Sequence, residues 1–284
     1  MIKINFIPPH TTEQKPISFK EWEFPAGEVG VRLGDEARGY KGCEWFIAWH
    51  FESTKETSLL GNLVDAIRHV DSDAILNLSV PYLPFSRQDR AVHYGDSFAL
   101  KEFGRVLNGM AFSRVTTWDV HSDVAQKVVE RLNDIPQQAW GSLLIDNHEF
   151  THVIAPDAGA AKKIYKSTNG KHVEVIVCSK ARDETGAVIG LDVEVGEVKR
   201  GNKYLVLDDI CDGGATFNFL AKELEIPSDQ MHLYTTHGIY SRGLDDLLSN
   251  YSSVFTANLM SKDEFTINMF KKDDKCPLLF VAHG

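Results

Sequence analysis

Hydrophobic and polar positions follow a regular rhythm along the chain, in which short apolar runs alternate with longer amphipathic stretches. In the first half, apolar runs of strand length occur at 44–50, 74–80 and 114–120. Apolar residues spaced three and four apart predict helices at 58–70, 98–110 and 124–132. Strands that alternate with helices build parallel sheets covered by helices, so this half is predicted to form an α/β domain.

The same rhythm restarts in the second half. Further apolar runs predict strands at 151–157, 172–179, 203–209 and 232–238. The segment 131–150 contains a proline and several turn-forming residues, so we place a domain boundary near residue 140. The predicted fold class is therefore α/β, with domains at 1–140 and 141–284 that each hold a parallel sheet flanked by helices. Ligands of such sheets bind beyond the carboxyl ends of the strands.

Composition and charge argue against several classes of protein. The 284 residues are 43% hydrophobic and 25% charged, as in a chain with a packed core. The formal net charge of −10 argues against a nucleic-acid binder and against a partner of anionic membranes. The 4 cysteines include no CxxC pair, and no apolar run is long enough to span a bilayer. We expect a soluble, reduced, cytoplasmic protein without a membrane partner.

One stretch combines glycines with acids directly after a predicted strand. Residues 206–217 read VLDDICDGGATF, and Thr216 is predicted to cap the helix that follows. Backbone amides at a helix N-terminus bind an anion, whereas Asp208 and Asp209 accept hydrogen bonds from sugar hydroxyls or hold a divalent cation. A ribose that carries a 5-phosphate needs both functions side by side. The structural alternative is a solvated acidic turn.

The stretch at 206–217 resembles the ribose-phosphate-binding motif of the type I phosphoribosyltransferase fold. A second segment, VPYLPFSRQDR at 80–90, resembles one that ribose-phosphate pyrophosphokinases (PRPP synthetases) have and phosphoribosyltransferases lack. Shorter matches follow the order of that family: FPAGE at 24–28, WDVHSD at 118–123, APDAGA at 155–160, SKAR at 179–182 and THGIYSRG at 236–243. In combination, these segments identify the chain as a divergent short member of the ribose-phosphate pyrophosphokinase family.

The resemblance implies two tandem phosphoribosyltransferase-type, Rossmann-like domains and a set of site residues. The residues it implies for ATP are Phe24, Gly27, Glu28, Arg87, Gln88, Asp89 and Arg90. The residues it implies for the ribose phosphate are Asp208, Asp209, Asp212, Gly213, Gly214, Ala215 and Thr216. It places Mg²⁺ at His121 and Asp157, and it makes Lys180 and Arg182 catalytic, at the start of a polar loop that closes over the reaction centre.

The implied enzyme is a transferase of the ribose-phosphate diphosphokinase type, with ATP as co-substrate and Mg²⁺ as cofactor. It transfers the β,γ-diphosphate of ATP to the anomeric hydroxyl of ribose 5-phosphate and releases AMP. The other partners expected are copies of the chain itself, in a dimer or a larger homo-oligomer. In the family, the loop matched by 24–28 reaches the nucleotide site of a neighbouring subunit.

Departures from the family pattern keep alternatives open. The usual phosphate loop runs Asp-Thr-Gly-Gly-Thr, whereas this chain has Gly213 in place of the first threonine and Ala215 in place of the second glycine. Loss of that side chain opens the pocket wall, so an acceptor with a substituted phosphate, such as the ADP-ribose of NAD metabolism, is an alternative to ribose 5-phosphate. A non-catalytic regulatory homologue is a second alternative. A phosphoribosyltransferase that consumes PRPP is a third, and the segment 80–90 argues against it.

Overall fold

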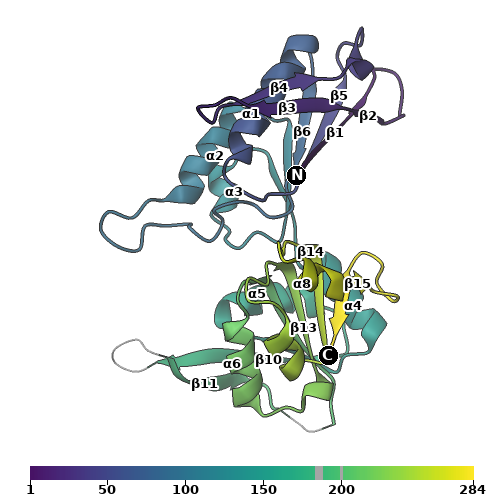
Figure 1. Cartoon of the computed structure of the whole chain (residues 1–284). Helices are drawn as coiled ribbons and strands as arrows, with labels where there is room; N and C mark the ends of the chain where they lie inside the picture. The colour runs from purple at the N-terminus through teal and green to yellow at the C-terminus, as the bar shows by residue number, and fades with distance from the viewer. Residues whose placement is uncertain (183–187, 199–200) are drawn as a thin grey trace. The chain divides into compact units, whose positions relative to one another are not determined.

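The protein is described here by a computed structural model that covers residues 1–182, 188–198 and 201–284 (Figure 1). The chain forms two compact units, Met1–Ile135 and Pro136–Gly284. The boundary predicted near residue 140 falls within helix α4 (Gln138–His148), which belongs to the second unit. In the described ranges, no helix combines the length and the apolar character needed to cross a membrane.

The first unit is built on a six-stranded sheet in the order β2-β1-β5-β6-β7-β8. Its strands are β1 (Ile2–Ile7), β2 (Lys15–Ile17), β5 (Glu44–Trp49), β6 (Ile75–Ser79), β7 (Arg114–Trp118) and β8 (Leu132–Ile135). Strands β5 to β8 are parallel, and β1 pairs antiparallel with both β2 and β5. The carboxyl ends of β5 to β8 therefore share one edge of the sheet.

Three helices accompany this sheet: α1 (Glu56–Val70), α2 (Ala99–Gly109) and α3 (Ala125–Val128). The strands predicted at 44–50, 74–80 and 114–120 and the helices predicted at 58–70 and 98–110 are confirmed. The helix predicted at 124–132 is wrong beyond Val128. Arg131 has a φ of 55°, a left-handed conformation that no helix continues through, and Leu132 starts β8 beside Val115 of β7.

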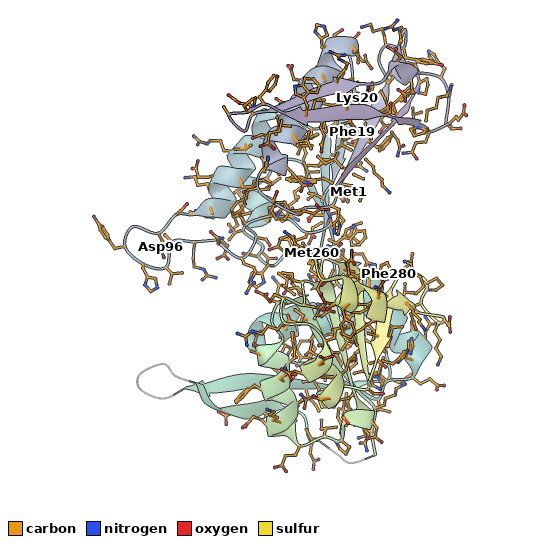
Figure 2. The ribbon with its side chains drawn as sticks, in the orientation of Figure 1. Met1, Phe19, Lys20, Asp96, Met260 and Phe280 are labelled. Atoms are coloured by element: carbon orange, nitrogen blue, oxygen red, sulfur yellow. The ribbon has the colours of Figure 1, made fainter. Side chains whose placement is uncertain are left out.

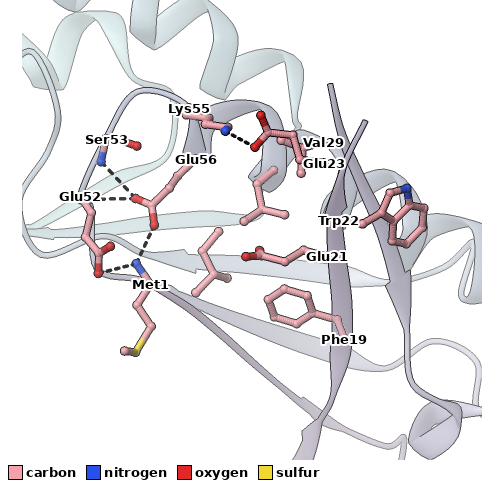
Figure 3. A pocket seen from close by; sticks show the side chains of 12 residues that line it. Met1, Phe19, Glu21, Trp22, Glu23, Val29, Glu52, Ser53, Lys55 and Glu56 are labelled. Atoms are coloured by element: carbon pink, nitrogen blue, oxygen red, sulfur yellow. Dashed lines mark hydrogen bonds and ion pairs between the residues drawn. The ribbon is translucent and has the colours of Figure 1, made fainter. Parts of the chain in front are cut away.

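A separate antiparallel hairpin of β3 (Phe19–Glu23) and β4 (Val29–Leu33) lies against α1, with a 3-10 turn, η1 (Asp35–Ala37), after it. Figure 2 labels Phe19 and Lys20 at the start of β3. An ion pair between Lys55 and Glu23 ties the hairpin to the start of α1. The two elements border a pocket of about 730 Å³, whose lining includes four glutamates (Figure 3).

The second unit holds an eight-stranded sheet in the order β11-β10-β9-β12-β13-β14-β16-β15. Its strands are β9 (His152–Ala155), β10 (Glu174–Arg182), β11 (Val188–Val195), β12 (Tyr204–Cys211), β13 (Met231–Gly238), β14 (Ser253–Leu259), β15 (Lys271–Lys272) and β16 (Phe280–His283). Strands β10, β9, β12, β13 and β14 are parallel, and β11, β15 and β16 add antiparallel edges. The helical elements after α4 are α5 (Ala158–Thr168), α6 (Ala215–Leu224), η2 (Ser228–Gln230), α7 (Asp245–Asn250) and α8 (Glu264–Met269).

The predicted fold class is confirmed, because both units are α/β with parallel strands at the centre of each sheet. Strand β12 is buried from Tyr204 to Leu207, as the apolar run in the sequence predicts, and β13 is buried along its whole length. Burial of both faces is typical of the central strands of a parallel sheet. In the second unit, these two strands position the polar loops that follow them.

Candidate functional site

The loops after β6 and β7 meet at the carboxyl edge of the first sheet. The first of these loops contains Arg87, Gln88, Asp89 and Arg90, and the second contains His121. The hydroxyl of Ser122, next to His121, donates a hydrogen bond to Asp89 Oδ2 at 2.6 Å. The structure thus brings the predicted metal residue His121 to the predicted ATP-binding loop.

Asp89 holds this pair of loops together. Arg90 Nε donates to Asp89 Oδ1 at 2.9 Å, so both carboxylate oxygens accept hydrogen bonds. Burial raises the pKa of Asp89, but the hydrogen bonds from Arg90 and Ser122 and the positive charges of Arg90 and His121 outweigh it and lower that pKa. Asp89 is therefore an ionised anchor, whereas Arg87 and Gln88 are exposed and can contact a ligand.

Replacing Ser122 with alanine is expected to raise the KM for ATP about tenfold with little change in kcat, because the variant removes one charge-assisted hydrogen bond between the loops. Steady-state kinetics at saturating acceptor measures both constants. Ser113→Ala, which alters an exposed hydroxyl before β7, is the matched control. An unchanged KM in Ser122→Ala would show that the Asp89 anchor has no role in nucleotide binding.

The turn between β3 and β4 carries the other predicted ATP-binding residues, Phe24, Gly27 and Glu28. Phe24 N donates to Glu28 O at 2.8 Å, and Gly27 N donates to Phe24 O at 2.8 Å, which closes the turn. The Phe24 side chain packs edge-on against Trp22, with ring centroids 6.1 Å apart, and Phe24 is still 50% exposed. The tip of the hairpin therefore presents an aromatic ring to solvent.

In the second unit, three carboxylates gather where the neighbouring strands β9 and β12 end. Asp208 and Asp209 are in β12, and Asp157 caps α5, with its Oδ1 accepting a hydrogen bond from Ala160 N at 2.9 Å. Lys163, on the same helix, places its Nζ 2.9 Å from Asp209 Oδ2. The structure thus brings the predicted metal residue Asp157 to the predicted acceptor acids.

The acids repel one another electrostatically. Burial, the negative charge of Asp209 and the negative charge of Asp157 raise the pKa of Asp208 well above its usual value. The hydrogen bond from the backbone N–H of Asp209 and the positive charge of Lys163 offset this only in part. A divalent cation among these oxygens would relieve the repulsion. Mg²⁺ prefers oxygen ligands, so the carboxylates fit Mg²⁺ better than the imidazole of His121 does.

The loop after β12 opens helix α6, as predicted, but the cap differs. Gly214, with a φ of 74°, is the N-cap residue, and Thr216 lies in the first turn of the helix. The prediction that Thr216 caps the helix is wrong because the chain enters the helix through a left-handed residue, a conformation that glycine adopts at little cost. Asp212 Oδ1 accepts a hydrogen bond from Ser241 Oγ at 2.6 Å, which fixes the start of this loop to the segment after β13.

The positively charged side chain of Arg242 lies beside Gly213. A Cβ atom on Gly213 would lie 3.2 Å from Cδ and 3.3 Å from Nε of Arg242. The Arg242 side chain therefore occupies the place of the wall that a threonine would form in the family's loop. The expectation that this wall is open is corrected accordingly. The sequence pattern includes Arg242 in THGIYSRG, but nothing in that pattern indicates its contact with the phosphate loop.

Lys180 and Arg182 are in β10, which continues past the predicted end of the strand at 179. The backbone of β10 pairs with β11 through Lys180 opposite Leu191 and Arg182 opposite Val188. The prediction that 180–182 starts a polar loop is therefore wrong, because pairing with β11 extends the strand. The segment 183–187 of the predicted loop lies outside the described residues. Strand β9 ends beside Val177, so both positions lie beyond the carboxyl end of their parallel neighbour.

A further group of ligand-type atoms lies elsewhere in the second unit. One atom each from His148, Asp273 and Cys276 lies within 4.8 Å of the other two. Asp273 Oδ2 accepts from Cys276 N at 2.8 Å and lies 2.8 Å from His148 Nε2. Burial and the charge of Asp273 raise the pKa of the Cys276 thiol. Hydrogen bonding accounts for the arrangement, and it shares no residue with the predicted magnesium site.

No protein-family model matches the chain. The chain is 24% identical over 272 residues to "Ribose-phosphate pyrophosphokinase" of Bacillus subtilis (strain 168), an alignment that covers 91% of this chain and 83% of that protein. It is 26% identical over 232 residues to the protein of the same name from Hyphomonas neptunium (strain ATCC 15444), covering 77% of this chain and 70% of that one.

The fold is also found in a solved structure. The crystal structure of phosphoribosylpyrophosphate synthetase from Mycobacterium smegmatis matches with a TM-score of 0.71 at 20% identity, covering 84% of this chain and 78% of that chain. These comparisons confirm the predicted resemblance and the fold class, and the names of the curated relatives describe transferase enzymes.

Proposed function

We propose that this chain, a homologue of the ribose-phosphate pyrophosphokinases over most of its length, is a Mg²⁺-dependent diphosphokinase with ribose 5-phosphate as acceptor. The observation that carries this proposal is the convergence of Asp157, Asp208 and Asp209 next to a glycine loop that opens α6. Carboxylates suit the hydroxyls of a ribose, and backbone amides at a helix N-terminus suit its phosphate. A ribose phosphate matches both.

The acceptor residues divide by chemistry. Asp208 and Asp209 accept hydrogen bonds from the vicinal hydroxyls of the ribose, and Lys163 positions the Asp209 carboxylate through the pair at 2.9 Å. The loop from Asp212 to Thr216 holds the 5-phosphate with its amides. Bound Mg²⁺ would neutralise charge on the diphosphate of ATP. The oxygens of Asp157 and of the Asp208–Asp209 pair would hold it.

The donor residues belong to the first unit. Arg87 and Gln88, which are exposed, and Arg90 bind ATP, and Asp89 positions the loop that carries them. The anomeric oxygen attacks the β-phosphorus, the bond from that phosphorus to the α,β-bridging oxygen breaks, and AMP leaves with that oxygen. The acceptor hydroxyl loses its proton to solvent water in the same step. Lys180 and Arg182 stabilise charge on the transferring diphosphate.

The test is the formation of AMP from ATP with ribose 5-phosphate and MgCl₂, with PRPP followed by phosphorus NMR. Reactions without acceptor, or with EDTA in place of MgCl₂, are the controls. AMP and PRPP in equal amounts support the proposal. A folded protein that forms neither product would instead support the regulatory homologue.

A second candidate acceptor is a ribose whose 5-phosphate is substituted, such as ADP-ribose. The contact of Arg242 with Gly213 favours it, because a guanidinium next to the phosphate loop can engage an additional phosphate. The chemistry at the anomeric hydroxyl is the same for both acceptors. The two candidates therefore differ only in what the pocket contacts beyond the first phosphate.

We also propose that the active form is at least a dimer, because the Phe24–Glu28 turn presents an exposed aromatic ring at the tip of its hairpin. Sedimentation is expected to give a mass of at least twice 31.8 kDa. Phe24→Ala should raise the KM for ATP about tenfold, as expected for an aromatic contact between subunits. The matched control is Leu278→Ala, at a residue that is 65% exposed. A fully active monomer would contradict this prediction.

A further inference from the structure

A cavity of about 740 Å³ lies beyond the carboxyl ends of β13 and β14 in the second unit. Its walls are the loop after β13, the loop after β14 and α8. Met260, labelled in Figure 2, follows β14, and its backbone N–H donates to Gly238 O at 2.8 Å. Strands β12, β13 and β14 are parallel neighbours, so this cavity and the proposed acceptor loop share one edge of the sheet.

Two adjacent residues connect the cavity wall to the acceptor loop. Ser241 donates from its hydroxyl to Asp212 Oδ1 at 2.6 Å and from its backbone N–H to Asp212 O at 3.1 Å. The Arg242 side chain lies against Gly213, as the 3.2 Å approach of a Cβ atom there indicates. Ser241 and Arg242 line the cavity as well, so a ligand in the acceptor loop can extend past Arg242 into it.

The cavity offers groups for a phosphate and for an aromatic ring. Arg242 and Lys262 supply positive charge, and Phe265 is 66% exposed. The lining residue Asp263 already accepts hydrogen bonds from the backbone N–H and the hydroxyl of Thr266. Within the described part of the chain, no acidic side chain forms an ion pair with the Arg242 guanidinium. A phosphate is therefore an appropriate partner for it.

We propose that this cavity binds the outer phosphate and the base of an acceptor whose ribose 5-phosphate is joined through a diphosphate to a nucleoside, as in ADP-ribose. The inference rests on the proposed function and names the acceptor class of the same site. The ribose and the inner phosphate occupy the loop after β12, Arg242 and Lys262 bind the outer phosphate, and the base stacks on Phe265. A volume of about 740 Å³ lies within the range of small-molecule sites.

Calorimetric titration with ADP-ribose and with ribose 5-phosphate, in MgCl₂ without ATP, tests the assignment. Arg242→Gln is expected to weaken ADP-ribose binding about tenfold or more, because it removes a charged partner of the outer phosphate. Phe265→Ala should weaken it about tenfold, the effect of one lost stacking contact. Lys262→Gln should weaken ADP-ribose alone. In Lys262→Gln and Phe265→Ala, the Kd for ribose 5-phosphate should stay within about twofold.

The matched controls are Lys222→Gln on α6 and Leu278→Ala, both at exposed positions outside the cavity, and neither should alter the binding of either acceptor. Ribose 5-phosphate must also displace ADP-ribose, since both use the loop after β12. The inference is overturned if ADP-ribose does not bind, if ribose 5-phosphate fails to displace it, or if Lys262→Gln and Phe265→Ala weaken both acceptors equally. AMP formation with ribose 5-phosphate in those cases would leave the proposed function intact.

Gly213→Thr gives a kinetic test of the same assignment. The Cβ of the added side chain would lie 3.2 Å from Arg242 Cδ, so the Arg242 side chain has to shift slightly, and the threonine restores the hydroxyl of the family's loop. The ratio of kcat/KM for ADP-ribose to that for ribose 5-phosphate is expected to fall about tenfold. Gly213→Ala separates the steric effect from the hydroxyl. An unchanged ratio in Gly213→Thr would contradict the role given to Arg242.

Discussion

We expect replacement of Lys180 or Arg182 with alanine to lower kcat about 10²- to 10³-fold. The KM values for ATP and for the acceptor should change far less. The reason is that charge builds up on the diphosphate as it leaves AMP, and cations that meet it only at that moment stabilise the transition state. The position of both residues supports this role, because β10 carries them beyond the end of β9 at the carboxyl edge of the sheet.

Steady-state kinetics with each variant measures the effect, and thermal unfolding checks that the fold is retained. Lys166→Ala, at an exposed position on α5, is the matched control and should keep full activity. Single-turnover experiments at saturating substrate separate diphosphate transfer from product release. Near-normal turnover in both variants would remove this pair from the mechanism.

Asp208→Asn is expected to raise the stability of the protein and to lower kcat/KM for the acceptor about 100-fold. Asp208 has a raised pKa in the folded state because of its burial and of the charges of Asp209 and Asp157. In the unfolded chain this carboxyl ionises at its usual pKa, whereas in the folded protein it ionises only at the raised pKa. The free energy of unfolding therefore falls as pH rises between these two pKa values. Asparagine avoids that loss. Its amide cannot replace a charged acceptor for the ribose hydroxyls, and loss of a charge-assisted hydrogen bond of this kind costs about 2–3 kcal/mol.

Chemical denaturation at pH 8 and at pH 4 tests whether Asp208→Asn raises or lowers the free energy of unfolding. At pH 8 the free energy of unfolding of Asp208→Asn should exceed that of the parent by about 0.5–2 kcal/mol, a range common for single stabilising substitutions, and the difference should shrink at pH 4. Added Mg²⁺ should stabilise the parent more than the variant. Asp229→Asn in η2 is the control for loss of a negative charge elsewhere. A variant less stable than the parent at pH 8 would contradict the electrostatic account.

The central strands could be predicted from sequence because their burial makes them continuous apolar runs. The strands that the pattern missed depend on their neighbours. β8 has the sequence LNDI, which becomes a strand through pairing with β7. β14 contains serine, threonine and asparagine, yet its residues from Ser253 to Asn258 are buried between β13 and β16. Hydrogen bonding across the sheet decides such strands, and a single sequence does not reveal it.

The candidate site divides in the same way. Asp89, in the loop after β6, and Asp208, in the second half of β12, could be selected as candidates from the sequence because motif and approximate position agree. Ser122 and Lys163 could not, because their hydrogen-bond partners, Asp89 and Asp209, lie 33 and 46 residues away along the chain. Arg242 could not either, because its proximity to Gly213 is evident only from the packing of the loops. For Lys163 the sequence offers only a lysine beside the apolar face of a helix. Each of these residues is linked to the candidate site only by a tertiary contact, which the sequence does not show.

The extension of β10 has a mechanical consequence. Past Val177, the backbone of β10 has lost its pairing with β9 and keeps only the antiparallel pairing with β11. A ribbon of two strands is marginally stable alone, so bending it costs little compared with bending the sheet. The residues that set its stiffness include Asp192 and Val193, paired with Ser179 and Cys178. We therefore expect substitutions at Asp192 and Val193 to change kcat, because they alter the ribbon that carries the proposed catalytic pair.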